Sequence, residues 1–290
     1  MVSPSMSVSK VVPGIRLDLS AMLLVLMHLA VFTVFFVHLS WGVAALALGA
    51  YLVRMFAITA GYHRYFSHRA FKTSRAFQLV LAVLGTASMQ NGPRWWASWH
   101  RRHHKTADTV NDPHSPAHIG LWRAHLGWVL EEKAQHPDFS NIKDLTVFPE
   151  LRFLERHKWI PLVGWAVGCL LIAGWSGVVW GFVVSTIVRF HATLLINSLA
   201  HVWGSRRYET EDASRNNALL AVITLGEGWH NNHHHFMSSA RQGFFWWEID
   251  VTFDVLWLLR AVGVVWGVRS PTAEALRGPL VVRPAPAHAT

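Results

Sequence analysis

Long apolar runs, separated by short polar breaks, dominate this chain and predict helices that cross a membrane. The four runs cover about residues 20–38, 43–60, 159–175 and 178–200. Each is close to the ~20 residues that a helix needs to cross a bilayer. The breaks at Ser40-Trp41-Gly42 and Ser176-Gly177 leave room only for tight turns. The pattern therefore predicts an all-α integral membrane protein with four transmembrane helices in two hairpins.

The other stretches predict a cytosolic helical cap on one side of the membrane. Residues 76–89 are apolar but short for a crossing, so we expect an interfacial or re-entrant helix there. Residues 246–268 carry charges among apolar positions and predict an amphipathic stretch that does not cross. We expect a cytosolic tail over residues 1–17, one folded domain over 18–268 and a disordered tail over 269–290.

Composition supports a membrane protein and argues against a nucleic-acid partner. The 290-residue chain is 52% apolar and only 15% charged, where soluble domains have about 25% charged residues. Its formal charge of +9 is spread among the apolar runs, which fits the Lys and Arg bias of cytoplasmic loops and not a basic nucleic-acid face. The single cysteine, Cys169, excludes an intrachain disulfide and a cysteine-rich metal site.

Clustered histidines are the strongest chemical signal. Two triplets share the spacing HxxHH and a pair precedes them: His100, His103 and His104; His230, His233 and His234; His63 and His68. On a helix, His100 and His104 lie on one face, with His103 beside them. Neutral imidazole is a good ligand for divalent iron, copper, zinc and nickel. The repeated pattern therefore predicts a transition-metal site held by nitrogen ligands.

Polar side chains inside the apolar runs are further candidates for function. Asn197 and His201 are four residues apart and therefore share a face at the end of the last run. His191 precedes them, and its role stays open between structure and function. His28 is expected to be structural, and Arg54 to pair or to reach the interface.

The motifs resemble those of membrane fatty acyl desaturases of the stearoyl-CoA (delta-9) type, in their bacterial forms. The similarity runs from about Tyr51 to Gly263 and rests on the segments 61–68, 100–104, 112–114, 197–201 and 226–234. In that family nine histidines hold two irons, and an asparagine helps through a water. The resemblance implies that the ligands here are His63, His68, His100, His103, His104, His201, His230, His233 and His234, with Asn197 acting through water. It also implies a bacterial inner-membrane enzyme whose active site and termini are cytoplasmic.

The resemblance also covers the substrate path. The residues that it implies for substrate binding are Gln90, Asn91, Trp96, Thr193 and Leu194. Leu194 departs from the family, which has a tryptophan there. Ser98-Trp99 replaces an Arg-Asp pair at the coenzyme A end of the animal enzymes, and Asn232 replaces their tyrosine. The head group therefore stays open between acyl-CoA and a lipid-linked acyl chain.

The implied reaction removes two hydrogens from adjacent methylene groups of an acyl chain, with carbon 9 as the expected position. Such unactivated groups require an oxidant made from O₂ at a metal. We therefore expect two iron ions and O₂, although zinc fits the same ligands. The chain has no GxGxxG fingerprint after a strand and no cysteine cluster. Electrons must come from a separate carrier such as cytochrome b5, a ferredoxin or a flavoprotein-linked system.

Several alternatives stay open from the sequence. An acidic carrier could dock on basic residues that are otherwise ordinary cytoplasmic charges: Arg101, Arg102, Lys105, Arg206 and Arg207. A structural role is expected for the histidines outside the motifs, namely His114, His118, His125, His136 and His235. One rival function is a di-iron membrane hydroxylase, which would make an alcohol. The other is a metal transporter, whose ligands would lie near the bilayer midplane.

Overall fold

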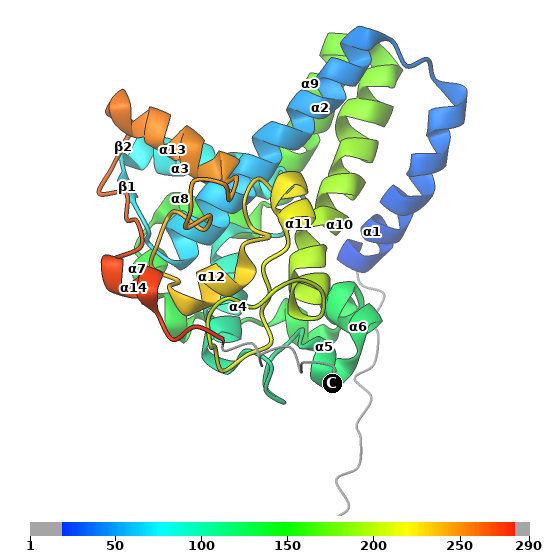
Figure 1. Ribbon diagram of the computed structural model, residues 1–290. Coiled ribbons are helices and arrows are strands. Elements are labelled where there is room, and N and C mark those ends of the chain that lie inside the picture. Colours follow the sequence, from blue (N-terminus) through cyan, green and yellow to red (C-terminus); the bar gives the residue numbers. More distant parts are fainter. Residues whose placement is uncertain (1–18, 282–290) are drawn as a thin grey trace, which may run out of the picture.

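The computed structural model describes residues 19–281, so the tail expected over 1–17 and residues 282–290 lie outside the described residues. Long helices rise from a cap of shorter ones (Figure 1). Within the described part, two helices are long and apolar enough to cross a bilayer, Trp41–Ser67 and Trp159–His201. The second of them turns back at Ala173-Gly174, and Ser20–Phe36 is a shorter apolar helix, so four spans in two hairpins stay a prediction.

The first pair of apolar elements turns slightly earlier than predicted. Helix α1 (Leu19–Ala30) continues as the 3₁₀ helix η1 (Val31–Phe36), and α2 (Trp41–Phe56) follows an extended break. Trp41 and Gly42 are therefore helical and not part of the break. The hydroxyl of Ser40 accepts a hydrogen bond from Val43 N at 3.3 Å and so caps α2.

The second pair also turns earlier than predicted, at Ala173-Gly174 and not at Ser176-Gly177. It comprises α9 (Trp159–Ser176), the π-helix η6 (Gly177–Val184), α10 (Ser185–Ser198) and the 3₁₀ turn η7 (Leu199–His201). Gly174 has φ 58°, a conformation that glycine adopts at little cost. Gly177 is helical, and a Cβ there would overlap the Cys169 carbonyl. Its missing side chain thus serves close packing and not the turn.

The cap contains the remaining elements, most of them short. They are α3 (Arg75–Thr86), α4 (Pro93–Thr106), α5 (Pro116–Ile119), α6 (Leu121–His125), η3 (Gly127–Leu130), η4 (Glu132–Gln135), η5 (Phe139–Ile142), α7 (Lys143–Thr146), α8 (Pro149–Arg156), α11 (Ala218–Ile223), α12 (His230–His235), α13 (Val251–Ala261) and α14 (Ala273–Arg277). Helix α3 is only 12 residues long, about 18 Å. That length is too short for the ~30 Å hydrocarbon core.

The fold is mostly helical, in agreement with the predicted all-α class, and its described strands β1 (Lys72–Thr73) and β2 (Val265–Trp266) form one short antiparallel pair. The expectation of a disordered C-terminal tail from residue 269 was wrong in part. The C-terminal segment is ordered as far as residue 281. There α14 docks on the cap, and backbone hydrogen bonds join Glu209 to Pro279 and Val281 to Arg207. Residues 279–281 are thus ordered by backbone pairing with residues 207–209, although their own composition favours disorder.

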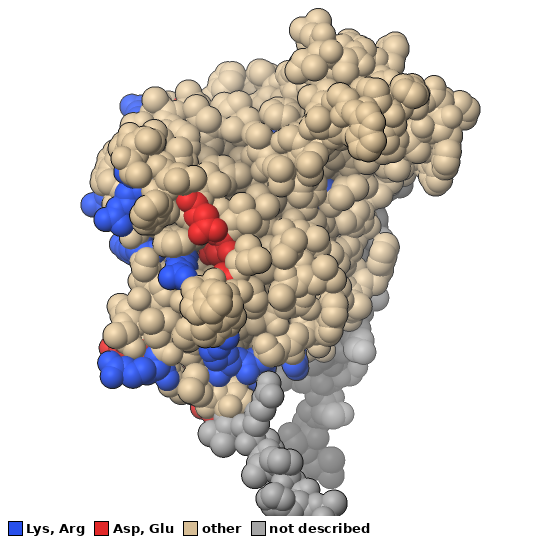
Figure 2. All heavy atoms as spheres, turned by 45° about the horizontal axis from the view of Figure 1, so that its top comes forward, with Lys and Arg blue, Asp and Glu red and all other residues tan. Residues whose placement is uncertain are grey.

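The surface separates into an apolar end and a charged end. In Figure 2 the end formed by the long helices is almost free of Lys, Arg, Asp and Glu, which gather at the cap. Trp41, Phe36 and Leu171 are 93%, 87% and 80% exposed at the apolar end. Exposed aromatic and aliphatic side chains on this scale indicate a surface covered by lipid.

Arg54 is fully buried and pairs within the protein instead of reaching the interface. Its guanidinium donates to the hydroxyls of Thr186 (2.6 Å) and Ser185 (2.5 Å) and to the carbonyl of Ala87 (3.3 Å). These bonds tie α2 to α10 and to the end of α3. The two long hairpins are thereby fixed to the cap at the level where the histidines begin.

Candidate metal centre

The predicted histidines converge from four separate segments into two clusters. In each cluster, one ring nitrogen of every member lies within 4.8 Å of the others. The five-histidine cluster contains His63, His68, His100, His104 and His233. The four-histidine cluster contains His103, His201, His230 and His234. All nine predicted histidine ligands are thus present in one of two compact, neighbouring groups, whereas Asn197 lies in the wall of the cavities beside them.

Helices α4 and α12 each contribute to both clusters. In α4, His100 and His104 enter the five-histidine cluster, and His103 enters the other. In α12 the assignment is reversed: His233 joins the five-histidine cluster, and His230 and His234 join the four-histidine cluster. A residue at i+3 is rotated by about 60° from the face shared by i and i+4. The spacing HxxHH therefore lets one helix link two metal sites.

His63 and His68 come from the π-helix η2 (Ala57–Ser67), which continues α2, and from its C-cap. π-Helical turns often occur at functional sites. His201 ends η7, after the long second hairpin. Both apolar hairpins thus deliver histidines at the end nearest the cap.

Four histidines are oriented by carboxylates through Nδ1. The pairs are His63 with Glu227, His103 with Asp112 (3.1 Å), His201 with Asp108 (2.8 Å) and His234 with Asp212 (2.7 Å). A carboxylate on Nδ1 places the proton there and leaves Nε2 as a bare lone pair for a metal. Sequence reasoning did not assign this role to any of the four. The segments 112–114 and 226–234 contain Asp112 and Glu227, but neither motif reveals which histidine the carboxylate contacts.

The carboxylates remain charged in their buried setting. Burial alone would raise the pKa of Asp108, but the hydrogen bond and charge of His201 lower it to about 2. Asp212 behaves alike, with a pKa held well below its usual range by His234 despite burial. Among the described residues, three carboxylates contact histidines of the four-histidine cluster, whereas only Glu227 contacts one of the five-histidine cluster, and it also pairs with Arg64 at 3.0 Å.

The donor set fits metal ions. The Nδ1 atom of His234 is bonded to Asp212, and its buried Nε2 has no hydrogen-bond partner among the described residues. In the other cluster, Nε2 of His68 and of His100 face each other at 2.7 Å. Lone pairs that converge in this way require a shared proton or a cation. Neutral imidazole nitrogens without thiolates suit iron or zinc.

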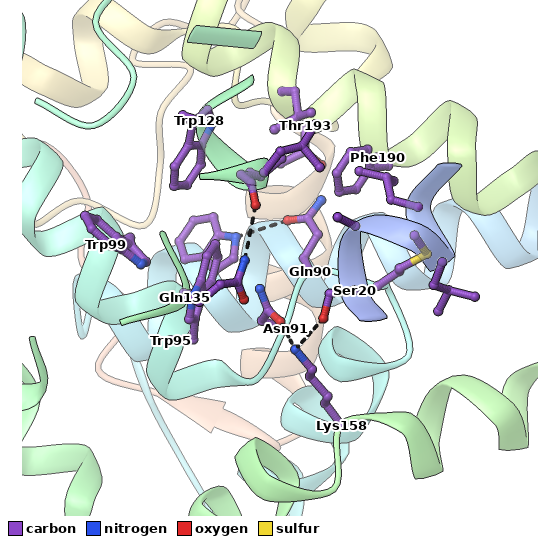
Figure 3. Close-up of a pocket in the computed structure, with 18 of the residues that line it drawn as sticks. Ser20, Gln90, Asn91, Trp95, Trp99, Trp128, Gln135, Lys158, Phe190 and Thr193 are labelled. Atoms are coloured by element: carbon purple, nitrogen blue, oxygen red, sulfur yellow. Dashed lines mark hydrogen bonds between the residues drawn. The ribbon is translucent and has the colours of Figure 1, made fainter. Parts of the chain in front are cut away.

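A cavity of about 990 Å³, its opening included, leads to these clusters. Apolar and aromatic side chains form most of its wall, among them Trp95, Trp99, Trp128 and Phe190 (Figure 3). His100 and Asn197 line its inner end and also line a smaller cavity between the two clusters. At the outer end, Lys158 Nζ donates to Asn91 Oδ1 at 2.6 Å and to Ser20 Oγ at 3.3 Å.

The sequence profile described as "Fatty acid desaturase" matches residues 39–257. This chain belongs to the fatty acid desaturase family.

Three curated relatives show how far the similarity extends. An acyl-CoA 5-desaturase of Anemone leveillei is 40% identical over 80% of this chain and 74% of its own length. The sn-1 stearoyl-lipid 9-desaturase of Anabaena variabilis is 37% identical over 80% of this chain and 86% of its own. A probable chloroplastic lipid desaturase of Arabidopsis thaliana is 36% identical over 78% of this chain, which spans only 63% of that relative.

The structure places all five predicted substrate residues of this desaturase in the wall of the large cavity: Gln90, Asn91, Trp96, Thr193 and Leu194. Trp96 and Thr193 also line the inner cavity beside the clusters. Trp96 is held by a hydrogen bond from its indole nitrogen to Gln90 Oε1 at 3.0 Å. Gln90 and Trp96 therefore act as one unit in the wall.

The histidines for which a structural role was expected lie outside both clusters, and most of them make contacts within the protein. His114 is buried against His103, with ring centroids 4.4 Å apart, and lines the large cavity. His125 binds His191, which in turn binds His28, each at 2.9 Å. The last two are thus structural partners across α1 and α10. His118 and His136 are exposed, and His235 faces α14 through the Ala275 carbonyl.

Three of the five basic residues considered for carrier docking are already engaged. Arg101 binds Asp144 at 2.7 Å, and Arg207 binds Glu248 at 2.5 Å. Arg206 donates to the Asp212 carbonyl at 2.9 Å and so holds a loop of the metal centre. Arg102 and Lys105 stay candidates for docking.

The metal-free desaturase is predicted to lose stability in mild acid. Burial, followed by repulsion from neighbouring histidines, lowers the pKa of His68, His100 and His104 well below 6.5. Burial lowers that of His234 to about 4 despite Asp212. Because the unfolded chain binds more protons below pH 6.5, the folded state is penalised as the pH falls from about 6.5 toward 4. The melting temperature of chelator-treated protein in neutral detergent should be lower at pH 5.5 than at pH 7.5. An unchanged melting temperature would contradict the prediction.

Proposed function

We propose that this chain is an O₂-dependent di-iron desaturase that introduces a cis double bond, at carbon 9, into a saturated acyl chain. The observation that carries the proposal is the junction of the large apolar cavity with both histidine clusters. An acyl chain is the substrate that such a cavity accommodates, since burial contributes about 0.8 kcal/mol per methylene group.

Two iron ions are proposed to occupy the clusters. The five-histidine cluster would hold one, and the four-histidine cluster would hold the other, with Asn197 contributing through a water. When bound, the irons supply the oxidant made from O₂. Overall, a –CH₂–CH₂– unit, O₂, two electrons and two protons give –CH=CH– and two waters.

The protein's own part is to place and isolate the acyl chain. Trp96, Thr193 and Asn197 form the wall where the two cavities meet, so they would set which pair of carbons lies beside the clusters. The tryptophans around the large cavity exclude water from the chain. Holding two adjacent methylenes at the centre favours removal of a second hydrogen over transfer of oxygen to the first carbon.

The remaining parts of the proposal concern electrons and the membrane. A separate carrier of the cytochrome b5, ferredoxin or flavoprotein-linked type would deliver electrons, with Arg102 and Lys105 as its available contacts. We propose four spans in two hairpins within a desaturase domain over residues 18–268, in a bacterial inner membrane with the cap and both termini cytoplasmic. The acyl group would arrive as acyl-CoA or as part of a membrane lipid.

Product analysis tests the function directly. Membrane lipids of a host that expresses the chain with a compatible electron donor would be analysed by gas chromatography with mass spectrometry. A new monounsaturated acid, located at carbon 9 by derivatisation, is the expected result. A hydroxylated acid would instead identify a hydroxylase that uses the same centre. A double bond elsewhere would keep the reaction and correct its position.

A further inference from the structure

A second, basic pocket lies directly beside the outer end of the large cavity. Its lining includes Arg94, Arg152, Arg156 and His157. The two hollows share two chain segments: residues 91–95 and 155–159 contribute to both, with Trp95 and Lys158 on the cavity side. A ligand whose acyl chain fills the cavity would therefore leave its head group close to this pocket.

The positive charge of the pocket is only partly neutralised by the protein. Glu150 binds Arg75 at 2.7 Å, outside the pocket, whereas Glu155 lines the pocket, accepts a hydrogen bond from Trp95 N at 3.0 Å and lies close enough to Arg94 to raise the pKa of that guanidinium. In the part of the chain that the structure describes, no carboxylate lies within 4 Å of the guanidinium of Arg152 or Arg156. The pocket thus presents three guanidinium groups against one carboxylate, which already caps the start of α4.

Arg94 shows the same shortage of partners. Its Nε is buried without a hydrogen bond among the described residues, and its guanidinium lies 4.4 Å from the Phe139 ring centre. Burial lowers its pKa, Glu155 raises it, and the nearby charge of Arg152 lowers it again. Arg152 and Arg156 are exposed, so water screens part of this repulsion, and an anion bound between the guanidinium groups would relieve the rest.

The pocket also lies beside the first residues of the apolar helix α9, which is proposed to enter the membrane. Phe153 and Ile160 beside it are 52% and 57% exposed, and α9 starts its apolar run at Trp159. Side chains at this level meet the head-group layer of a bilayer. Guanidinium groups bind phosphate through paired, charge-assisted hydrogen bonds.

We infer that the pocket formed by Arg94, Arg152, Arg156 and His157 binds a phosphate group of the acyl substrate's head group. The inference rests on the proposed function, since it takes the cavity beside it to hold the acyl chain. Phosphate is common to two sources, a glycerophospholipid and coenzyme A. The pocket gives the enzyme a means to select charged acyl carriers over neutral ones.

Binding measurements need no electron donor and test the inference separately from catalysis. Calorimetry on the purified protein in neutral detergent would compare 1-palmitoyl-lysophosphatidylglycerol, palmitoyl-CoA and uncharged 1-palmitoylglycerol. The Arg152→Ala/Arg156→Ala variant should weaken binding of at least one phosphate-bearing ligand by about tenfold or more. Binding of 1-palmitoylglycerol should change less than about twofold, which also shows that the variant is folded.

The control is Arg260→Ala/Arg277→Ala, which removes two exposed arginines outside the pocket. It should leave all three affinities unchanged. If Arg152→Ala/Arg156→Ala weakens binding of the lysophospholipid alone, the site takes a lipid head group. If it weakens binding of palmitoyl-CoA alone, the site takes coenzyme A. An equal effect on charged and neutral ligands, or no effect, overturns the inference. Failure of the wild type to bind 1-palmitoylglycerol would instead count against an acyl cavity, and so against the proposed function.

Discussion

Product formation is expected to fall by at least about a hundredfold when His100 and His104 are replaced together by alanine, since even loss of an outer partner of a ligand costs 10–100-fold. Both side chains belong to the five-histidine cluster, which would keep only three donors. The four-histidine cluster loses none of its members. Iron bound per protein should therefore drop to about half, because one site is emptied and the other remains.

The matched control removes two histidines elsewhere. His38 and His136 are exposed, and neither belongs to a cluster. The His38→Ala/His136→Ala variant should keep both iron content and product. Metal analysis of purified protein and lipid analysis of the expressing host give the two readouts. Retention of product by the His100→Ala/His104→Ala variant would show that the histidine clusters are not the reaction centre.

The two outer carboxylates Asp212 and Glu227 are predicted to control different metal sites. Asp212 orients His234 in the four-histidine cluster, and Glu227 orients His63 in the five-histidine cluster. Asn or Gln at these positions can still accept a hydrogen bond from Nδ1 but carries no charge. We expect each substitution to weaken metal affinity about 10–100-fold at its own cluster only.

Comparing one variant at each carboxylate tests this prediction. Metal-free protein would be titrated with Co²⁺, whose absorption reports the site geometry, for Asp212→Asn, Glu227→Gln and wild type. Asp212→Asn should weaken one of two binding phases, and Glu227→Gln the other. Arg64 keeps Asp250 at 2.9 Å in Glu227→Gln, so the buried guanidinium retains a partner. Loss of both phases in either variant would indicate general unfolding and contradict site-specific control.

Much of the chemistry was predictable because it depends on local spacing. A period of 3.6 residues places His100 and His104 on one helix face whatever the rest of the chain does. The apolar runs likewise fix long helices through composition alone. Arg54 illustrates the limit: its place in an apolar run predicts pairing or snorkelling, but its partners Thr186 and Ser185 lie more than 130 residues away.

The sequence by itself therefore determined the nine histidines, their imidazole chemistry and the apolar character of the helices that carry them. Only the tertiary structure decided how the histidines divide, because His103 and His233 each turn to the cluster opposite their helix neighbours. It also decided which carboxylate supports which ring, and that Arg152 and Arg156 adjoin the cavity mouth. The physical reason is separation along the chain. Helix periodicity acts over about four residues, whereas the histidine–carboxylate pairs and the two clusters join segments that meet only when the hairpins pack on the cap.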